Sequence, residues 1–237
     1  RVADREASAA VKQSFLEATG KYATENDIKE TQLNITYAKN MRLTPEEIRR
    51  MDTDVEKFPE IFCTYNAKLR QMQMIDYDDQ MIYALRILEQ YPEVLAHFRE
   101  QYRYFCVDEA QDTSKIQHDM IDLLAAQSRN LFMVGDEDQS IYGFRAAYPQ
   151  ALVSFEDRHP GARLLLMEIN YRSRQEIVRA ADTLIQKNRN RHPKKMTAAR
   201  ENGGCVTEIR AVSRQGQYNY LLKVAQDCGQ ETAVLYR

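Results

Sequence analysis

Two short apolar runs in the middle of the chain each end abruptly in acidic side chains. Residues 105–107 (Phe-Cys-Val) run into Asp108 and Glu109, and residues 131–134 (Leu-Phe-Met-Val) reach Asp136 after one glycine. An apolar run of this length between polar residues is typical of a fully buried strand. A helical interval separates the two runs. They therefore predict two strands of a parallel α/β sheet, with a site along the edge where the strands end.

Before these runs, apolar residues recur at helical spacing. The first 60 or so residues predict irregularly charged helices, and residues 54–74 keep helical spacing over many turns. Thr44 is an expected N-cap, followed by Pro45 at the first helical position and Glu47 at the third. We interpret this region as a helical subdomain or insertion, and its residues indicate no chemistry.

Three carboxylates gather in residues 75–79 (Ile-Asp-Tyr-Asp-Asp). They could form a metal cluster, but the start of a helix explains them better. Asp76 would be the N-cap, with Asp78 and Asp79 in the first turn, where the helix dipole favours negative charge. This helix is expected to run to about Gln90, and a shorter one follows from proline 92 to about residue 101.

The second half of the chain predicts alternating strands and helices. The expected elements are a helix started by the capping box at 114–117, a helix at 148–157, a strand at 163–167, a helix started by the capping box at 173–176, a strand opened by the glycines at 203–204, a helix at 218–225 and a strand at 232–236.

Charge and cysteine content narrow the class of protein. With 33 basic and 35 acidic residues the net charge is −2, so any DNA contact must use a local groove. Residues 187–200 are rich in Lys and Arg, which suits either a nucleic-acid patch or a solvated loop. The four cysteines are far apart, and Cys106 lies inside an apolar run. They predict reduced, buried or incidental thiols in a cytoplasmic protein. No apolar run approaches the roughly 18 residues of a membrane span.

Asp108 and Glu109 are the central candidates for chemistry. A carboxylate at a strand end can hold Mg²⁺ directly or through water, and its neighbour can orient and deprotonate an attacking water. Gln111 and Asp112 lie one turn further on and could tie neighbouring loops together.

A second acidic group follows the second apolar run. The carboxylates of Asp136, Glu137 and Asp138 would repel one another unless a cation or arginines lie nearby. Gln139 comes next and could reach a phosphate as a neutral donor.

Two aromatic–arginine groups complete the candidates. Tyr142, Phe144 and Arg145 stand in a glycine-containing loop, which suits stacking on a base with a phosphate contact, although an ordinary core phenylalanine explains Phe144 equally well. Tyr171 and Arg172 precede an expected helix start. They could stack a nucleobase and neutralise a phosphate as an arginine finger, or Arg172 could form a surface ion pair.

Three segments, in this order and spacing, strongly resemble the motifs of one family. Residues 107–112 (VDEAQD), 134–147 (VGDEDQSIYGFRAA) and 169–173 (INYRS) resemble motifs II, III and IV of superfamily 1 DNA helicases of the UvrD/Rep/PcrA type. Residues 75–79 (IDYDD) and 232–237 (TAVLYR) are also similar to that family.

The resemblance extends from about residue 72 onward and implies an α/β fold built on part of a RecA-like P-loop NTPase parallel sheet with helices. Residues 1–71 would be a partial helical insertion. Residues 72–167 would form the second half of the first RecA-like motor domain, and residues 168–237 the start of the second.

The resemblance also assigns roles in ATP hydrolysis. Asp108 would hold the Mg²⁺ of Mg-ATP and Glu109 would activate the hydrolytic water. Gln139 would sense the γ-phosphate and couple it to DNA. Tyr171 would stack on adenine, and Arg172 would contact the γ-phosphate from the second motor domain.

The implied partner is single-stranded DNA or a duplex/single-strand junction, along which the family moves 3′ to 5′. Phe144 would stack on a base, with Tyr142 and Arg145 near the strand. Phe144 stands where the family usually has Trp, Ala146 where Gly is usual, and Ala110 where a bulkier residue is common.

One family feature is absent from these 237 residues. There is no G-x-x-x-x-G-K-[ST] segment, and the only Gly-Lys pair, Gly20-Lys21, is followed by Tyr22. A chain without this loop has no backbone cradle and no lysine for the β- and γ-phosphates. We therefore expect an internal fragment of a larger helicase that alone binds ATP poorly and does not hydrolyse it.

Two other functions fit parts of the pattern. A metal-dependent nuclease would use Asp108, Glu109, Asp136 and Asp138, and would cleave DNA without ATP, but it leaves Gln139 and the 171–172 pair without a role. The other is a non-catalytic DNA-binding or regulatory homologue that kept the helicase shape without a phosphate-binding loop.

Overall fold

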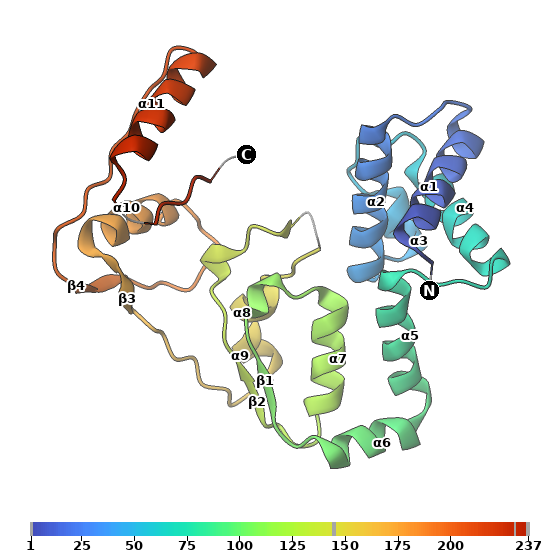
Figure 1. The fold of residues 1–237 in the computed structure, drawn as a ribbon. Helices are drawn as coiled ribbons and strands as arrows, with labels where there is room; N and C mark the ends of the chain where they lie inside the picture. Colours follow the sequence, from blue (N-terminus) through green and yellow to red (C-terminus); the bar gives the residue numbers. More distant parts are fainter. Residues whose placement is uncertain (1, 144–145, 230, 236–237) are drawn as a thin grey trace. The chain divides into compact units, whose positions relative to one another are not determined.

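The computed structural model describes residues 2–143, 146–229 and 231–235. The chain divides into two compact units, which we describe separately (Figure 1). The first consists of Arg1–Leu165 with Asn188–His192, and the second of Leu166–Lys187 with Pro193–Arg237. Helices dominate, and the strands form two small parallel sheets. Within the described ranges, no helix has the length and apolarity needed to cross a membrane.

Four helices form the start of the first unit, as the helical spacing predicts. They are α1 (Asp4–Thr19), α2 (Glu25–Asn40), α3 (Pro45–Arg49) and α4 (Phe58–Gln71). Their apolar faces meet in one core in which Phe58 and Ile61 are fully buried. The start signal for α3 is confirmed, because the Thr44 hydroxyl accepts from the Glu47 amide and the Glu47 carboxylate accepts from the Thr44 amide.

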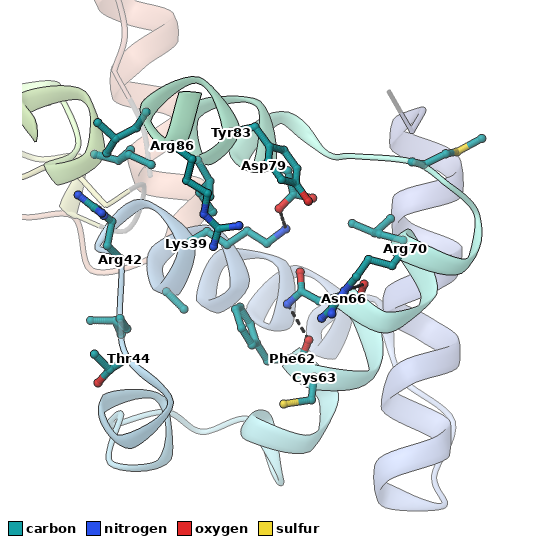
Figure 2. Close-up of a pocket in the computed structure, with 17 residues that line it drawn as sticks. Lys39, Arg42, Thr44, Phe62, Cys63, Asn66, Arg70, Asp79, Tyr83 and Arg86 are labelled. Carbon is teal, nitrogen blue, oxygen red and sulfur yellow. Dashed lines mark hydrogen bonds and ion pairs between the residues drawn. The ribbon is translucent and has the colours of Figure 1, made fainter. Parts of the chain in front are cut away.

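The acidic segment 75–79 begins the next helix, α5 (Tyr77–Gln90), and is held by a buried lysine. Asp76 is the N-cap and accepts from the Asp79 amide at 2.8 Å. The Lys39 ammonium lies 2.6 Å from the Asp76 carboxylate, and its side chain is only 2% exposed. It also lies 2.7 Å from the Asp79 carboxylate (Figure 2). The Tyr65 hydroxyl also donates to Asp76, and burial beside this carboxylate raises the pKa of Tyr65. The capping interpretation is therefore confirmed, and the carboxylates serve to join α2, α4 and α5.

The two central strands are present and parallel, but their burial differs from the prediction. Helix α6 (Pro92–Gln101) precedes β1 (Phe105–Val107). Strand β1 pairs with β2 (Leu131–Met133), and helix α7 (Lys115–Ala125) lies between the two strands in the sequence. Neither strand is fully buried, since Cys106 is exposed and Phe132 is 59% exposed. Side chains alternate between the faces of a sheet, and one face of this two-stranded sheet is open. All four cysteines are free and exposed, so the expected burial of Cys106 is wrong.

The helix expected at 148–157 is interrupted. The structure has two one-turn helices, α8 (Gln150–Val153) and α9 (Phe155–Arg158). Between them the Ser154 hydroxyl donates to the Gln150 carbonyl at 2.7 Å. Such a bond from a serine to the preceding turn competes with the helical pattern and bends the chain.

In the second unit, β3 (Ile169–Arg174) pairs in parallel with β4 (Thr197–Arg200), and α10 (Gln175–Ile185) and α11 (Arg214–Asp227) complete the helices. The 171–172 pair therefore lies within a strand, and the N-cap of α10 is Arg174 rather than the predicted serine. The strands predicted at 163–167 and at the stretch after the 203–204 glycines are wrong, because neither has a ladder partner among the described residues. The strand predicted at 232–236 is not formed by residues 232–235, and residue 236 lies outside the described residues.

Replacing Lys39 with Met should destabilise the first unit strongly. The substitution leaves two nearly buried carboxylates without their counter-charge, which costs about 3 kcal/mol of unfolding free energy. Denaturant unfolding followed by circular dichroism measures the change. Lys21→Met is the matched control, because Lys21 pairs with Glu56 at an exposed position. Equal effects of the two substitutions would contradict the role assigned to Lys39.

Candidate functional site

The first candidate carboxylates stand at the C-terminal end of β1. Asp108 and Glu109 are both exposed. The Asp108 carboxylate accepts from the Glu109 amide at 2.9 Å. Glu109 has a left-handed backbone, with φ of 50°, and opens the short 3₁₀ helix η1 (Ala110–Asp112). Left-handed conformations are uncommon outside glycine and mark a turn that neighbouring contacts must hold.

Gln111 is the contact that holds this turn. Its side chain is buried, its amide nitrogen donates to the Glu109 carboxylate at 2.6 Å, and its amide oxygen accepts from the Asp136 backbone amide at 3.0 Å. Its backbone carbonyl accepts from the Ser140 hydroxyl at 3.3 Å. One glutamine therefore connects the end of β1 with the loop after β2. The link expected for Gln111 is confirmed, whereas Asp112 is exposed.

Gly135 allows the two strand ends to approach this closely. A Cβ atom at this position would lie 2.7 Å from the Leu152 side chain and 2.8 Å from the Gln111 amide oxygen. Atoms do not pack at such separations, so any larger residue would displace the bridging glutamine or α8.

The acidic loop after Gly135 carries Gln139 in a defined orientation. Asp136 precedes the short 3₁₀ helix η2 (Glu137–Gln139), and its carboxylate accepts from the Asp138 amide at 3.1 Å. Its other oxygen accepts from the side-chain amide of Gln139 at 2.8 Å. Gln139 is exposed, on the same loop that Gln111 ties to Glu109.

The positive charge that this acidic loop requires comes from residues more than 50 positions later. The guanidinium of Arg191 donates to both carboxylate oxygens of Asp138, with distances of 2.7–3.0 Å, and the two side chains are 9% and 8% exposed. The His192 backbone amide donates to the Glu137 carboxylate at 2.8 Å. Sequence reasoning predicted a need for arginines here but did not identify Arg191, whose only signal was its place in the basic stretch 187–200.

His118 is a second residue that the sequence did not reveal. It is 1% exposed, and its Nε2 lies 2.5 Å from the Thr113 hydroxyl, which donates to the Ala110 carbonyl at 2.7 Å. Because that hydroxyl proton is used, Nε2 must carry the ring proton and Nδ1 must be bare. Among the described residues, the buried Nδ1 has no hydrogen-bond partner. Burial, aided by the positive charge of Arg158, lowers the pKa of His118 and keeps it neutral.

Three further candidates lie within the described residues. Tyr171 and Arg172 belong to the second unit, where both are exposed. The backbone amide of Arg172 donates to the Asn170 side chain at 3.0 Å. Tyr142 is 37% exposed. The DNA-stacking candidates at 144 and 145, Phe and Arg, lie outside the described residues.

A cavity of about 690 Å³ lies elsewhere in the first unit, lined mainly by residues of α2, α4 and α5 (Figure 2). Arginines 42, 70 and 86 are part of its wall. None of the candidate site residues lines it, so it is separate from the strand ends that carry Asp108 and Gln139.

Comparison with known proteins decides the family. Residues 2–160 match the family model described as the UvrD/REP helicase N-terminal domain. The chain belongs to this family. Among curated relatives, the "ATP-dependent DNA helicase PcrA" of Leuconostoc citreum is 36% identical over 212 residues, covering 86% of this chain and 28% of the relative. The PcrA proteins of Staphylococcus epidermidis and Staphylococcus aureus are 34% identical over 211 residues, covering 86% of this chain and 29% of each relative.

The chain thus spans less than a third of the length of these UvrD/REP-family relatives. The one Gly-Lys pair of this chain, Gly20-Lys21, does not form a phosphate-binding loop. Gly20 ends α1 with φ of 74°, and the Lys21 ammonium lies 2.6 Å from the Glu56 carboxylate.

The buried neutral His118 should make the stability of this UvrD/REP-family chain depend on pH. Its pKa is lower folded than unfolded, so the unfolded state takes up a proton first as the pH falls through about 6.5. The free energy of unfolding should fall below that pH by at most about 1.4 kcal/mol per pH unit. Denaturant midpoints between pH 5 and 8 measure this.

His118→Gln removes the titrating group and should flatten the pH profile, while His97→Gln, at an exposed position on α6, should leave it unchanged. A His118→Gln profile parallel to that of the unaltered chain would show that the imidazole does not titrate as its burial requires.

Proposed function

We propose that this chain contributes part of the motor of an ATP-dependent DNA helicase or translocase. Residues 72–167 would be the second half of the first RecA-like domain, residues 168–237 the start of the second, and residues 1–71 part of a helical insertion. Family membership supports the proposal. The observation that carries it is the Gln111 bridge, which joins Glu109 at one strand end to the loop of Gln139 at the next.

In this proposal the strand ends face the nucleotide. Asp108 holds Mg²⁺, Glu109 accepts a proton from the attacking water, and Gln139 donates to the γ-phosphate and relays its presence. Tyr171 stacks on the adenine, and Arg172 neutralises charge on the γ-phosphate. Mg²⁺, when bound with ATP, neutralises the charge that develops on the phosphates during hydrolysis.

The residues fit a magnesium ion that is held mainly by phosphate and water. Asp108 offers one exposed carboxylate, and the described residues contain no group of three His, Cys, Asp or Glu side chains placed to hold a metal. Mg²⁺ in nucleotide sites usually keeps several waters and takes only one or two carboxylates. A single carboxylate at the strand end is therefore sufficient on the protein side.

DNA would be bound by the loop that follows Gln139. Tyr142, Phe144 and Arg145 supply aromatic faces and a positive charge, which suits single-stranded DNA or its junction with duplex. Movement would be 3′ to 5′, driven by the cycle of nucleotide binding and hydrolysis at the neighbouring strand ends.

The nuclease alternative loses two of its four proposed metal ligands. Asp138 accepts hydrogen bonds from two guanidinium nitrogens of Arg191, and Asp136 already accepts from the Asp138 amide and from Gln139. Moving Asp138 away from its guanidinium to bind a metal would break a nearly buried ion pair.

The proposal is tested in a hybrid protein. Residues 2–160 replace the matching segment of the Leuconostoc citreum PcrA, which retains its own phosphate-binding residues. We expect Mg²⁺-dependent ATP hydrolysis stimulated by single-stranded DNA. Glu109→Gln should lower kcat by about 100-fold or more, because general-base catalysis contributes on that scale. Glu100→Gln, at an exposed position on α6, is the matched control and should have no effect.

Three outcomes would count against this function. A folded hybrid that binds DNA but hydrolyses no ATP would favour the non-catalytic homologue. DNA cleavage with Mg²⁺ or Mn²⁺ and without ATP would favour the nuclease. ATP hydrolysis by the 237-residue chain alone, abolished by Glu109→Gln, would contradict the requirement for a phosphate cradle from outside these residues.

A further inference from the structure

The segment Asn188–His192 is part of the first compact unit, although the residues on both sides of it belong to the second. Within the first unit it contacts η2. The Arg191 guanidinium makes a bidentate contact with the Asp138 carboxylate. The His192 backbone amide donates to the Glu137 carboxylate. We call these two contacts the 191–192 clasp.

The clasp holds carboxylates that would otherwise force the loop open. Asp136, Glu137 and Asp138 are consecutive, and their negative charges repel in a partly buried setting where water screens them weakly. A guanidinium matches the two oxygens of a carboxylate in geometry and charge, so Arg191 fixes the direction of the Asp138 side chain as well as neutralising it.

The orientation of Gln139 depends on the same turn. The Gln139 backbone amide donates to the Asp136 carbonyl at 2.9 Å, and its side-chain amide donates to the Asp136 carboxylate at 2.8 Å. The Ser140 amide donates to the Glu137 carbonyl at 3.3 Å. These bonds exist only while η2 keeps its shape, and the clasp is attached to two of its three residues.

We propose that Arg191 is a positioning residue for Gln139. It touches no nucleotide; it keeps η2 folded so that Asp136 can aim the Gln139 amide. His192 supports the same turn at Glu137, through its backbone amide and through Nδ1 at 3.5 Å from the carboxylate. Arg191 is the side chain that pairs with Asp138. The inference rests on the proposed function for what Gln139 does, but the geometric part, that Arg191 holds the loop, is independent of it.

The geometric part is tested in the 237-residue chain by hydrogen exchange of the amides of residues 138–140. Arg191→Gln should accelerate exchange at these amides by about tenfold or more, as expected when one or two charge-assisted hydrogen bonds are lost. Asp138→Asn should have a similar effect, and the double variant should add little. Arg189→Gln, in the same segment at an exposed position, is the matched control.

A double variant that swaps the two charges keeps the test informative even if a single variant misfolds. If Arg191→Gln unfolds the first unit, the pair Arg191→Asp with Asp138→Arg should restore both folding and slow exchange, because it rebuilds the ion pair in reverse. Unchanged exchange in both single variants would overturn the proposal, as would a charge-exchanged pair no better protected than Arg191→Asp alone.

The link to Gln139 is tested in a longer hybrid that carries residues 2–200 within the Leuconostoc citreum PcrA. Arg191→Gln should lower kcat for DNA-stimulated ATP hydrolysis by about tenfold with little change in KM for ATP, since a misplaced catalytic group costs rate rather than binding. Arg191→Lys should recover part of the rate. In a Gln139→Ala background, Arg191→Gln should have almost no further effect.

Different results would contradict the role of Arg191 and the proposed function. An independent loss of rate in the Gln139→Ala background would show that Arg191 acts elsewhere. A hybrid that is inactive even without substitutions would count against the proposed function while leaving the exchange result for the clasp intact.

Discussion

The two-sided hydrogen bonding of the Gln111 side chain is the interaction on which the candidate site depends. Parallel strands β1 and β2 place their carboxyl ends at one edge, but a three-residue ladder does not by itself fix the loops beyond it. A buried amide that donates to Glu109 and accepts from the Asp136 backbone converts two loops into one structure. Gly135 is part of the same arrangement, because only glycine leaves room for that amide oxygen. Loss of this one side chain would remove both bonds, the one to the Glu109 carboxylate and the one from the Asp136 backbone amide.

Long-range charge compensation is the second principle of the first unit. Both acidic clusters that could have been metal sites are instead paired with a basic side chain from a distant segment: Lys39 for residues 76–79 and Arg191 for residues 136–138. Each cation is nearly buried, so each ion pair loses hydration when the chain folds, and its hydrogen bonds fix the orientation of the carboxylates. The clusters therefore act as attachment points between segments, whereas Asp108 and Glu109 at the end of β1 are exposed and have no basic partner among the hydrogen bonds described above.

Local signals in the sequence predicted the local structure well. The helix starts at Thr44, Asp76 and Ser114 depend on residues three positions apart, so the capping chemistry could be inferred without the fold. The order of β1, α7 and β2 followed from apolar runs separated by a helical interval.

What the sequence could not predict depends on partners far along the chain. Apolar runs at 163–167 and 232–235 lack ladder partners in the described structure, and periodicity alone does not reveal whether a partner exists. The pairing of Arg191 with Asp138, 53 residues apart, carries no spacing signal. His118 was missed for the same reason, since a histidine within an amphipathic helix has no pattern that separates a buried hydrogen-bonding role from an exposed one. The roles of Gln139, Tyr171 and Arg172 stay predictions.

The open face of the β1–β2 sheet carries a reactive group, the Cys106 thiol, whose accessibility shows whether that face is covered. Cys106 lies in the middle of β1 with its thiol exposed, beside the exposed ring of Phe132 in the paired position on β2. Any polypeptide that covered this face would bury the ring and shield the sulfur together. The rate at which a thiol reagent modifies Cys106 therefore measures the covering of the sheet directly, at a position on the strand that leads into Asp108.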